Sequence, residues 1–143
     1  MAEGEQKTTV LFAEDEEGIR TLFERVFKNN GFHVLTAIDG QEALALAKGY
    51  KGHIDLLVSN IHMPHMSGPD LARELRKSRP GIKIMLMSGN PDGLLLLDKG
   101  WIFLSKPVLP ADVIKKIEGI LERPPAPEVD RGPESGFLPG GST

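Results

Sequence analysis

Short apolar segments alternate along the chain with longer segments that have helical periodicity. The apolar segments are nearly continuous, and they lie at 10–12, 34–36, 56–58, 82–87 and 102–104. Strands that are buried on both faces have this pattern, because helices cover both sides of a parallel sheet. Strand and helix in turn also require crossover connections, which join parallel strands. The sequence therefore predicts a doubly wound α/β domain with a five-stranded parallel sheet.

Helical periodicity marks four of the segments that connect or follow these strands. The clearest has apolar side chains three or four residues apart on one face: Ile19, Leu22, Phe23, Val26 and Phe27. Two more helices are expected over about 41–48 and from Pro69 onward, and a last one over 110–122. Only residues 90–99 connect the fourth and fifth strands, and they include a proline and a glycine. The fourth helix is therefore expected to be short or missing.

The composition is that of one globular domain. The 143 residues include no cysteine, which excludes disulfides and thiolate catalysis. A net charge of −3 gives no reason to expect nucleic-acid binding, and no apolar stretch is long enough to cross a membrane. We expect a disordered lead over 1–7, the domain over 8–122 and a flexible tail rich in proline and glycine over 123–143. The expected location is the cytoplasm.

Polar side chains follow four of the five predicted strands: Glu14 and Asp15, Asn60, Ser88 and Lys106. Because the carboxyl ends of parallel strands meet at one edge of a sheet, we expect these residues to lie together. Glu14 and Asp15 supply the negative charge that a small hard cation such as Mg²⁺ prefers. Structural roles are open as well: the two acids suit the start of a helix, and Lys106 could form an ion pair with Asp15.

The segment Met63-Pro64-His65-Met66-Ser67-Gly68 lies directly beyond Asn60. Together with the acidic pair, Lys106-Pro107 and the strand-to-helix junction at 37–44, it resembles the receiver domain of two-component response regulators. The resemblance extends over about residues 8–122. It implies a flavodoxin-like fold, in which helices cover both faces of a five-stranded parallel sheet.

The resemblance also implies roles for the polar residues. In receivers an aspartate after the third strand accepts a phosphoryl group, and Asn60 stands at that position here. The other implied phosphoryl-handling residues are Ser88 and Lys106, which place a hydroxyl and an ammonium near the phosphoryl oxygens. The implied Mg²⁺ ligands are Glu14, Asp15, Asn60 and the backbone carbonyl of His62. Phe103 matches the aromatic residue that the family couples to signal output.

Two departures from the receiver pattern bear on function. An amide is not nucleophilic at neutral pH and carries no charge, so Asn60 should form no acyl phosphate, and Mg²⁺ binding should be weakened. Trp101 stands where the resemblance suggests a small residue. We expect Trp101, Phe103 and the last helix to form a surface that contacts partners.

The sequence thus indicates a receiver module of a phosphorelay that cannot accept phosphate as written and acts through protein–protein contacts. The implied partners are a histidine kinase or a histidine phosphotransfer protein, and a downstream protein target. Enzymatic activity of the receiver type is expected only with an aspartate at position 60. The alternative is an ordinary phospho-accepting receiver in which that aspartate was replaced by Asn60 to trap the unphosphorylated state.

Three other interpretations have less support in the residues. A phosphoryl-transfer enzyme would need the aspartate, and a small-ligand module would need a feature such as a glycine-rich phosphate loop, which is absent. His62 and His65 lack a third ligand for zinc. The basic cluster at 73–79 is interpreted as the solvated face of a helix.

Overall fold

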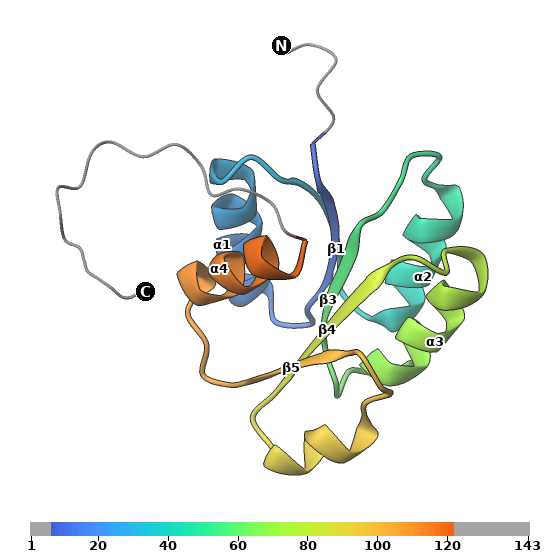
Figure 1. Cartoon of the computed structure of the whole chain (residues 1–143), viewed down its shortest axis with the longest axis vertical. Helices are drawn as coiled ribbons and strands as arrows, with labels where there is room; N and C mark the ends of the chain where they lie inside the picture. The colour runs from blue at the N-terminus through green and yellow to red at the C-terminus, as the bar shows by residue number, and fades with distance from the viewer. Residues whose placement is uncertain (1–6, 122–143) are drawn as a thin grey trace, which may run out of the picture.

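The sheet has five parallel strands. In this computed structural model, which describes residues 7–121, the strand order is β2-β1-β3-β4-β5 (Figure 1). The strands are β1 (Thr9–Ala13), β2 (His33–Ala37), β3 (Leu56–Asn60), β4 (Lys83–Ser88) and β5 (Ile102–Ser105). Each strand coincides with one of the predicted apolar segments. The predicted parallel α/β sheet is therefore confirmed.

Five helices lie within residues 7–121 and cover both faces of the sheet. They are α1 (Glu17–Asn29), α2 (Gly40–Gly49), α3 (Gly68–Ser78), the 3-10 helix η1 (Pro91–Leu96) and α4 (Pro110–Ile120). Helix α1 packs beside α4 on one face, and α2 packs beside α3 on the other (Figure 1). A helix between β4 and β5 is thus present as η1, and its six residues agree with the short helix that we expected.

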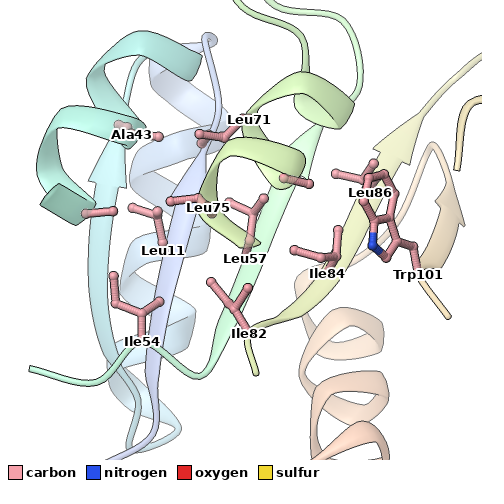
Figure 2. Close-up of a cluster of buried hydrophobic side chains, with 14 of the residues drawn as sticks. Leu11, Ala43, Ile54, Leu57, Leu71, Leu75, Ile82, Ile84, Leu86 and Trp101 are labelled. Carbon is pink, nitrogen blue, oxygen red and sulfur yellow. The ribbon is translucent and has the colours of Figure 1, made fainter. Parts of the chain in front are cut away.

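Two hydrophobic cores, one on each side of the sheet, explain why the strands are apolar at nearly every position. Leu11 and Leu57 belong to the core under α2 and α3, which Figure 2 shows. Phe12 and Val58 belong to the core under α1 and α4. Successive side chains of a strand point to opposite faces, so a central strand needs apolar residues throughout. Each fully buried side chain of this size contributes about 1.5–3 kcal/mol.

Aromatic side chains attach α1 to the sheet. Phe23 stacks on Phe12 of β1 with 5.3 Å between ring centroids, and Phe27 meets Phe12 edge-on at 5.5 Å. Phe32, just before β2, continues the cluster through Phe27. Of the predicted apolar face of the first helix, Phe23 and Phe27 are buried and Ile19 and Val26 are partly buried. Leu22 is 47% exposed, so the prediction was wrong for that residue.

Side-chain caps begin α2 and α3. Asp39 accepts a hydrogen bond from the Glu42 backbone N–H (2.8 Å), and Ser67 accepts one from Asp70 (3.2 Å). The Glu42 carboxylate also accepts from the N–H of Ile38, the residue before the N-cap Asp39, which adds a second hydrogen bond at the start of α2. Caps of this kind contribute about 1 kcal/mol each. These two caps therefore determine where the loops after β2 and β3 end and the helices begin.

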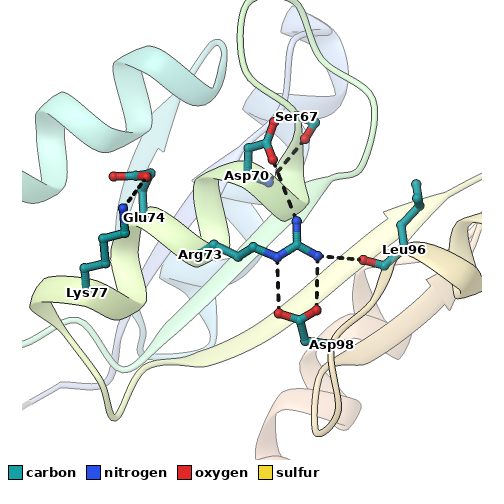
Figure 3. A network of polar contacts seen from close by, with 7 residues as sticks. All are labelled: Ser67, Asp70, Arg73, Glu74, Lys77, Leu96 and Asp98. Atoms are coloured by element: carbon teal, nitrogen blue, oxygen red, sulfur yellow. Dashed lines mark hydrogen bonds and ion pairs between the residues drawn. The ribbon is translucent and has the colours of Figure 1, made fainter.

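The basic cluster of α3 is solvated at Arg73 and Lys77, whose side chains are 47% and 71% exposed, so the prediction holds for those residues. The arginines of the cluster also bind remote groups, which the prediction did not include. Arg76 donates to the Ile82 carbonyl (3.0 Å), and Arg73 donates to the Asp98 carboxylate (Figure 3). Arg79 donates to three backbone carbonyls: that of Ala47 in the last turn of α2, and those of Tyr50 and Gly52 in the α2–β3 connection. Long side chains at the end of α3 therefore fasten neighbouring loops. Sequence spacing could not reveal these partners, because they are remote along the chain.

Some expectations concern residues outside the described range. Except for Lys7, the predicted N-terminal lead over 1–7 and the predicted tail over 123–143 fall there. Within residues 7–121, none of the helices combines the length and the apolar character that crossing a membrane requires.

A close backbone approach at Gly68 gives a stability prediction. A β-carbon at Gly68 would lie 2.2 Å from the Asn60 carbonyl oxygen, whereas one at Gly119 would meet nothing within 4 Å. We expect Gly68→Ala to lower the free energy of unfolding by about 1–3 kcal/mol, because backbone must shift. Gly119→Ala, inside α4, should raise it by about 0.5–1 kcal/mol. Urea unfolding measures both, and equal effects of the two variants would contradict the packing.

Candidate functional site

Four strand ends bring the predicted polar residues to one edge of the sheet. Asn60 is the last residue of β3 and Ser88 the last of β4, while Glu14 and Lys106 directly follow β1 and β5. The strand register makes these ends level, because Ala13 pairs with Ser59 and Ser88 pairs with Ser105. The expected gathering of these residues is confirmed.

Glu14 is the buried acid of the site. Only 1% of its surface is exposed. Its Oε2 accepts from the Glu16 N–H (3.0 Å), and its backbone carbonyl accepts from Arg20 Nη1 (2.9 Å). The ammonium nitrogen of Lys106 lies 3.8 Å from Glu14 Oε1. The expected pairing of Lys106 with Asp15 was therefore wrong, since the lysine is directed at the buried carboxylate rather than the exposed one.

Asn60 lies beside the other acid. Its Nδ2 donates to Asp15 Oδ1 (3.0 Å), and the residue is only 5% exposed. This hydrogen bond fixes the orientation of the amide, so that Nδ2 faces the carboxylate. An aspartate at this position would have no hydrogen to donate there. The amide therefore relieves the repulsion that a third carboxylate would create.

Two buried oxygen atoms of the site have no hydrogen-bond partner among the described residues. They are Glu14 Oε1 and Asn60 Oδ1. A buried acceptor without a partner costs about 1–3 kcal/mol, so such a pair is unusual. Oxygen acceptors of this kind fit a small hard cation, which takes carboxylate and amide oxygens as ligands. Residues 7–121 contain no cluster of three or more His, Cys, Asp or Glu side chains suited to a metal.

His62 lies two residues beyond β3, and its side chain is exposed. Within residues 7–121 no hydrogen bond is found between His62 and Glu14, Asp15 or Asn60. Its predicted part in the site concerns the backbone carbonyl alone, and stays a prediction.

Ser88 and Phe103 surround a glycine of η1. The Ser88 hydroxyl accepts from the Asn90 N–H (3.0 Å), and the Lys106 N–H donates to the Ser88 carbonyl (2.9 Å). A β-carbon at Gly93 would lie 3.0 Å from the Phe103 ring and 3.3 Å from Ser88 Cβ. The Phe103 ring and the β-carbon of Ser88 therefore lie close to Gly93 of η1, while the Ser88 hydroxyl bonds Asn90, the residue before η1.

Trp101 does not lie on an exposed contact surface. It is only 9% exposed and belongs to the core under α2 and α3 (Figure 2). Phe103 is partly buried and packs against the same core. The apolar side of α4 belongs to the core on the opposite face of the sheet. The predicted surface of Trp101, Phe103 and the last helix is therefore wrong as a single face. The indole packs beside β4, and the guanidinium of Arg73 lies over its ring at 5.4 Å from the centroid.

A pair of residues that sequence analysis did not connect fastens the loop after Asn60. His65 Nδ1 lies 3.0 Å from Asp39 Oδ2, and His65 has a φ of 73°, a left-handed backbone that side chains rarely adopt. The Glu42 N–H lowers the pKa of Asp39 below its usual value, and the hydrogen bond from His65 adds to this against the effect of burial. The one feature of the sequence that could have indicated this contact is the position of Asp39 directly before α2.

Comparison with known proteins identifies the family of this chain. The sequence model of the response regulator receiver domain matches residues 10–118. The chain belongs to that family. This receiver domain is 36% identical over 119 residues to the sensor kinase CckA of Brucella abortus, which covers 80% of the chain but 13% of the kinase. It is 31% identical to the alkaline phosphatase synthesis transcriptional regulatory protein PhoP of Bacillus subtilis, covering 80% of the chain and 48% of that protein.

Solved structures agree with this membership. The receiver domain of the hybrid histidine kinase CckA is 34% identical, with a TM-score of 0.70 over 79% of this chain and 98% of that one. The chemotaxis response regulator CheY4 of Vibrio cholerae is 26% identical, with a TM-score of 0.70 over 80% of this chain and 99% of that one. The flavodoxin-like receiver fold is therefore shown, and the receiver domain belongs to two-component signalling. The chain spans less than half the length of the two curated relatives.

The amide of Asn60 predicts a stability difference. Asn60→Asp should lower the free energy of unfolding in metal-free buffer by about 1–3 kcal/mol, because it removes the donor to Asp15 and adds a third carboxylate. Asn29→Asp, at the exposed end of α1, is the control with the same change in net charge. Urea unfolding in the presence of a chelator measures both. Equal losses would show that the position of the added charge is unimportant.

Proposed function

We propose that this receiver domain acts in two-component signalling through protein contacts, and that Asn60 accepts no phosphoryl group. The observation that carries this proposal is the state of the Asn60 amide, which is buried and donates Nδ2 to Asp15. An amide nitrogen in this arrangement has no lone pair available for attack at phosphorus. The signal of the domain would then be the presence or absence of a bound partner.

The proposed partners are a histidine kinase or a histidine phosphotransfer protein, and a downstream protein target. Receiver domains interact with kinases and downstream effectors, which supports this choice. The similarity to a sensor kinase and to a transcriptional regulatory protein agrees with either side of such a pathway. A cytoplasmic location and the lack of receiver-type enzymatic activity are parts of the same proposal.

Mg²⁺ is the proposed cofactor, bound more weakly than by a site with three carboxylates. The buried oxygens Glu14 Oε1 and Asn60 Oδ1 support the fit, because neither has a hydrogen-bond partner in the described part of the chain. Glu14, Asp15, Asn60 and the backbone carbonyl of His62 would hold the ion. When bound, Mg²⁺ supplies positive charge that offsets the negative charge of phosphoryl oxygens. Lys106, directly after β5, would supply further positive charge, and its ammonium lies near Glu14 in the absence of the ion.

A second candidate function is phosphoryl acceptance by a form of this domain with aspartate at position 60. The arrangement of the other residues favours it. Glu14, Ser88 and Lys106 lie at strand ends that are level with Asn60. These residues would assist a nucleophilic aspartate at position 60, but the amide of Asn60 does not need them. In this case Asn60 would mark a replaced aspartate that traps the unphosphorylated state.

Incubation with phosphoramidate and Mg²⁺, followed by intact-mass measurement, tests the proposal. We expect no added phosphoryl group on the chain, and one on Asn60→Asp, because only the nucleophile is lacking. The control Asn29→Asp should gain none, since its carboxylate lies far from Lys106. A phosphoryl adduct on the unaltered chain would refute the proposal.

Thermal melts with and without Mg²⁺ test the proposed cofactor. Asn60→Asp should melt lower than the unaltered chain without metal and gain more from Mg²⁺, because a third carboxylate strengthens cation binding. If both proteins gain equally, the position of Asn60 in the metal site is wrong.

A further inference from the structure

Strand β2 forms one edge of the sheet, and within residues 7–121 it pairs only with β1. The His33 N–H donates to the Thr8 carbonyl (2.9 Å), and the Ala37 carbonyl accepts from the Glu14 N–H (3.0 Å). In a parallel ladder, every second residue of a strand bonds the same neighbouring strand. The backbone groups of His33, Leu35 and Ala37 are therefore directed at β1.

The backbone groups of Val34 and Thr36 consequently point away from the sheet. Neither residue has a backbone hydrogen bond to another element in the described part of the chain. Edge strands are commonly protected by lysine, by proline or by a bulge. Strand β2 has no lysine and no proline, and its register with β1 is continuous from end to end. This edge is therefore open to a further strand.

A second copy of β2 matches the open edge in antiparallel orientation. If Leu35 lies opposite Leu35 of the other copy, Val34 lies opposite the other copy's Thr36. Such a pair exchanges both of its N–H···O=C bonds in an antiparallel ladder, so the outward groups of Val34 and Thr36 are all satisfied. A shift of the register by one residue would lose this match.

A groove beside β2 lies where the two Leu35 side chains would meet. It has a volume of about 410 Å³ and is lined by Leu35, Glu42, Ala45, Leu46, Gly49 and Tyr50. Leu35 is only partly buried, although it packs against the core under α2 and α3. Side chains come closest in a pair that shares no backbone hydrogen bonds, which is the kind of pair the two Leu35 residues would form. Pairing would therefore remove their remaining apolar surface from water.

Helix α2 runs back along β2. Its first turn lies beyond the end of β2, since the Glu42 carboxylate accepts from the Ile38 N–H (2.6 Å). Its far end lies beside the start of β2, because Tyr50 stacks on His33 with 5.9 Å between ring centroids. A two-fold axis through Leu35 would therefore place the start of each α2 beside the end of the other.

The two ends of α2 carry opposite charges. Glu42 lies in the first turn and Lys48 in the last, and both are exposed. In the paired arrangement each Glu42 would lie at the end where the other copy has its Lys48. Ala45 and Gly49 are exposed between them and are small, so two such helices can approach closely. The surface is thus complementary to itself in hydrogen bonding, apolar contact and charge, which identifies the partner as a second copy of this chain.

We propose that this receiver domain forms a two-fold dimer through β2 and α2, in which antiparallel pairing of the two β2 strands joins the sheets. The same elements of each copy contact each other, as in other isologous interfaces. One strand and one helix form a small interface, so the dimer dissociates on dilution. Position 60 has no part in this contact. The dimer can therefore fail while the proposed function holds, and the reverse.

Opposite charges at position 35 test the two-fold contact. Leu35→Lys alone and Leu35→Glu alone each place like charges across the axis, whereas an equal mixture of the two places opposite charges there. Sedimentation equilibrium should show the unaltered chain as monomer and dimer. It should show a dissociation constant raised by about tenfold or more for each variant alone, and a dimer again in the mixture. Leu22→Lys and Leu22→Glu, at an exposed leucine of α1, are the matched controls and should leave the dissociation constant unchanged.

Proline at position 36 tests the backbone bonds without adding charge, and it serves also if the variants at position 35 fail to fold. Thr36→Pro removes an N–H that faces away from β1, which an edge strand tolerates. Thr36→Val keeps that N–H and is its control. We expect Thr36→Pro to be monomeric and Thr36→Val to dimerise. In the unaltered chain, amide exchange at Val34 and Thr36 should slow as the protein concentration is raised, while exchange at Leu35 stays unchanged.

Three outcomes would overturn the proposal. One is an unaltered chain that stays monomeric at every concentration. Another is a dimer that persists in Leu35→Lys or in Thr36→Pro, because it would use a different surface. The third is a mixture of the two charged variants that stays monomeric although both are folded by circular dichroism.

Discussion

Burial of both faces of a parallel sheet is the constraint on which this receiver domain depends. Since β1, β3 and β4 have apolar side chains on both faces, polar groups are left to the strand ends and the loops. Parallel direction then sends the ends of β1, β3, β4 and β5 to the same edge. The site is therefore a consequence of the sheet, because it lies where β1, β3, β4 and β5 end at the same level.

Electrostatics at that edge centres on the buried carboxylate of Glu14. A charge with so little exposure needs nearby donors, and it has the Glu16 N–H and the more distant ammonium of Lys106. Asn60 contributes in a different way, because its amide hydrogen satisfies Asp15 and adds no negative charge. Where two acids already lie close together, an amide adds no electrostatic repulsion, whereas a third carboxylate would add some. The amide of Asn60 is not a nucleophile, and because it is uncharged it also stabilises the fold in the absence of a metal.

The region between β4 and β5 shows how a short connection can be held without a full helix. Gly93 lets the backbone of η1 press against Ser88 and Phe103, and Arg73 reaches across from α3 to fix Asp98. Trp101 completes this arrangement by filling the core beside β4 and stacking under the guanidinium. Trp101 and Arg73 thus hold this connection from the side of α3, while three leucines of η1 stay exposed.

The sequence by itself determined the succession of strands and helices along the chain, the parallel sheet, and which polar residues follow the strands at one edge. The near-continuous apolar runs predict strands that are buried on both faces, and the apolar face of α1 predicts a helix. Both follow because buried side chains recur with the period of the strand or the helix. Only the tertiary structure decided which charges meet. Lys106 lies near Glu14 rather than Asp15, Trp101 is buried in the core, and Arg73, although half exposed, forms an ion pair with Asp98. The partner of a long side chain depends on distances in space and on burial. Neither can be read from the spacing of residues along the chain.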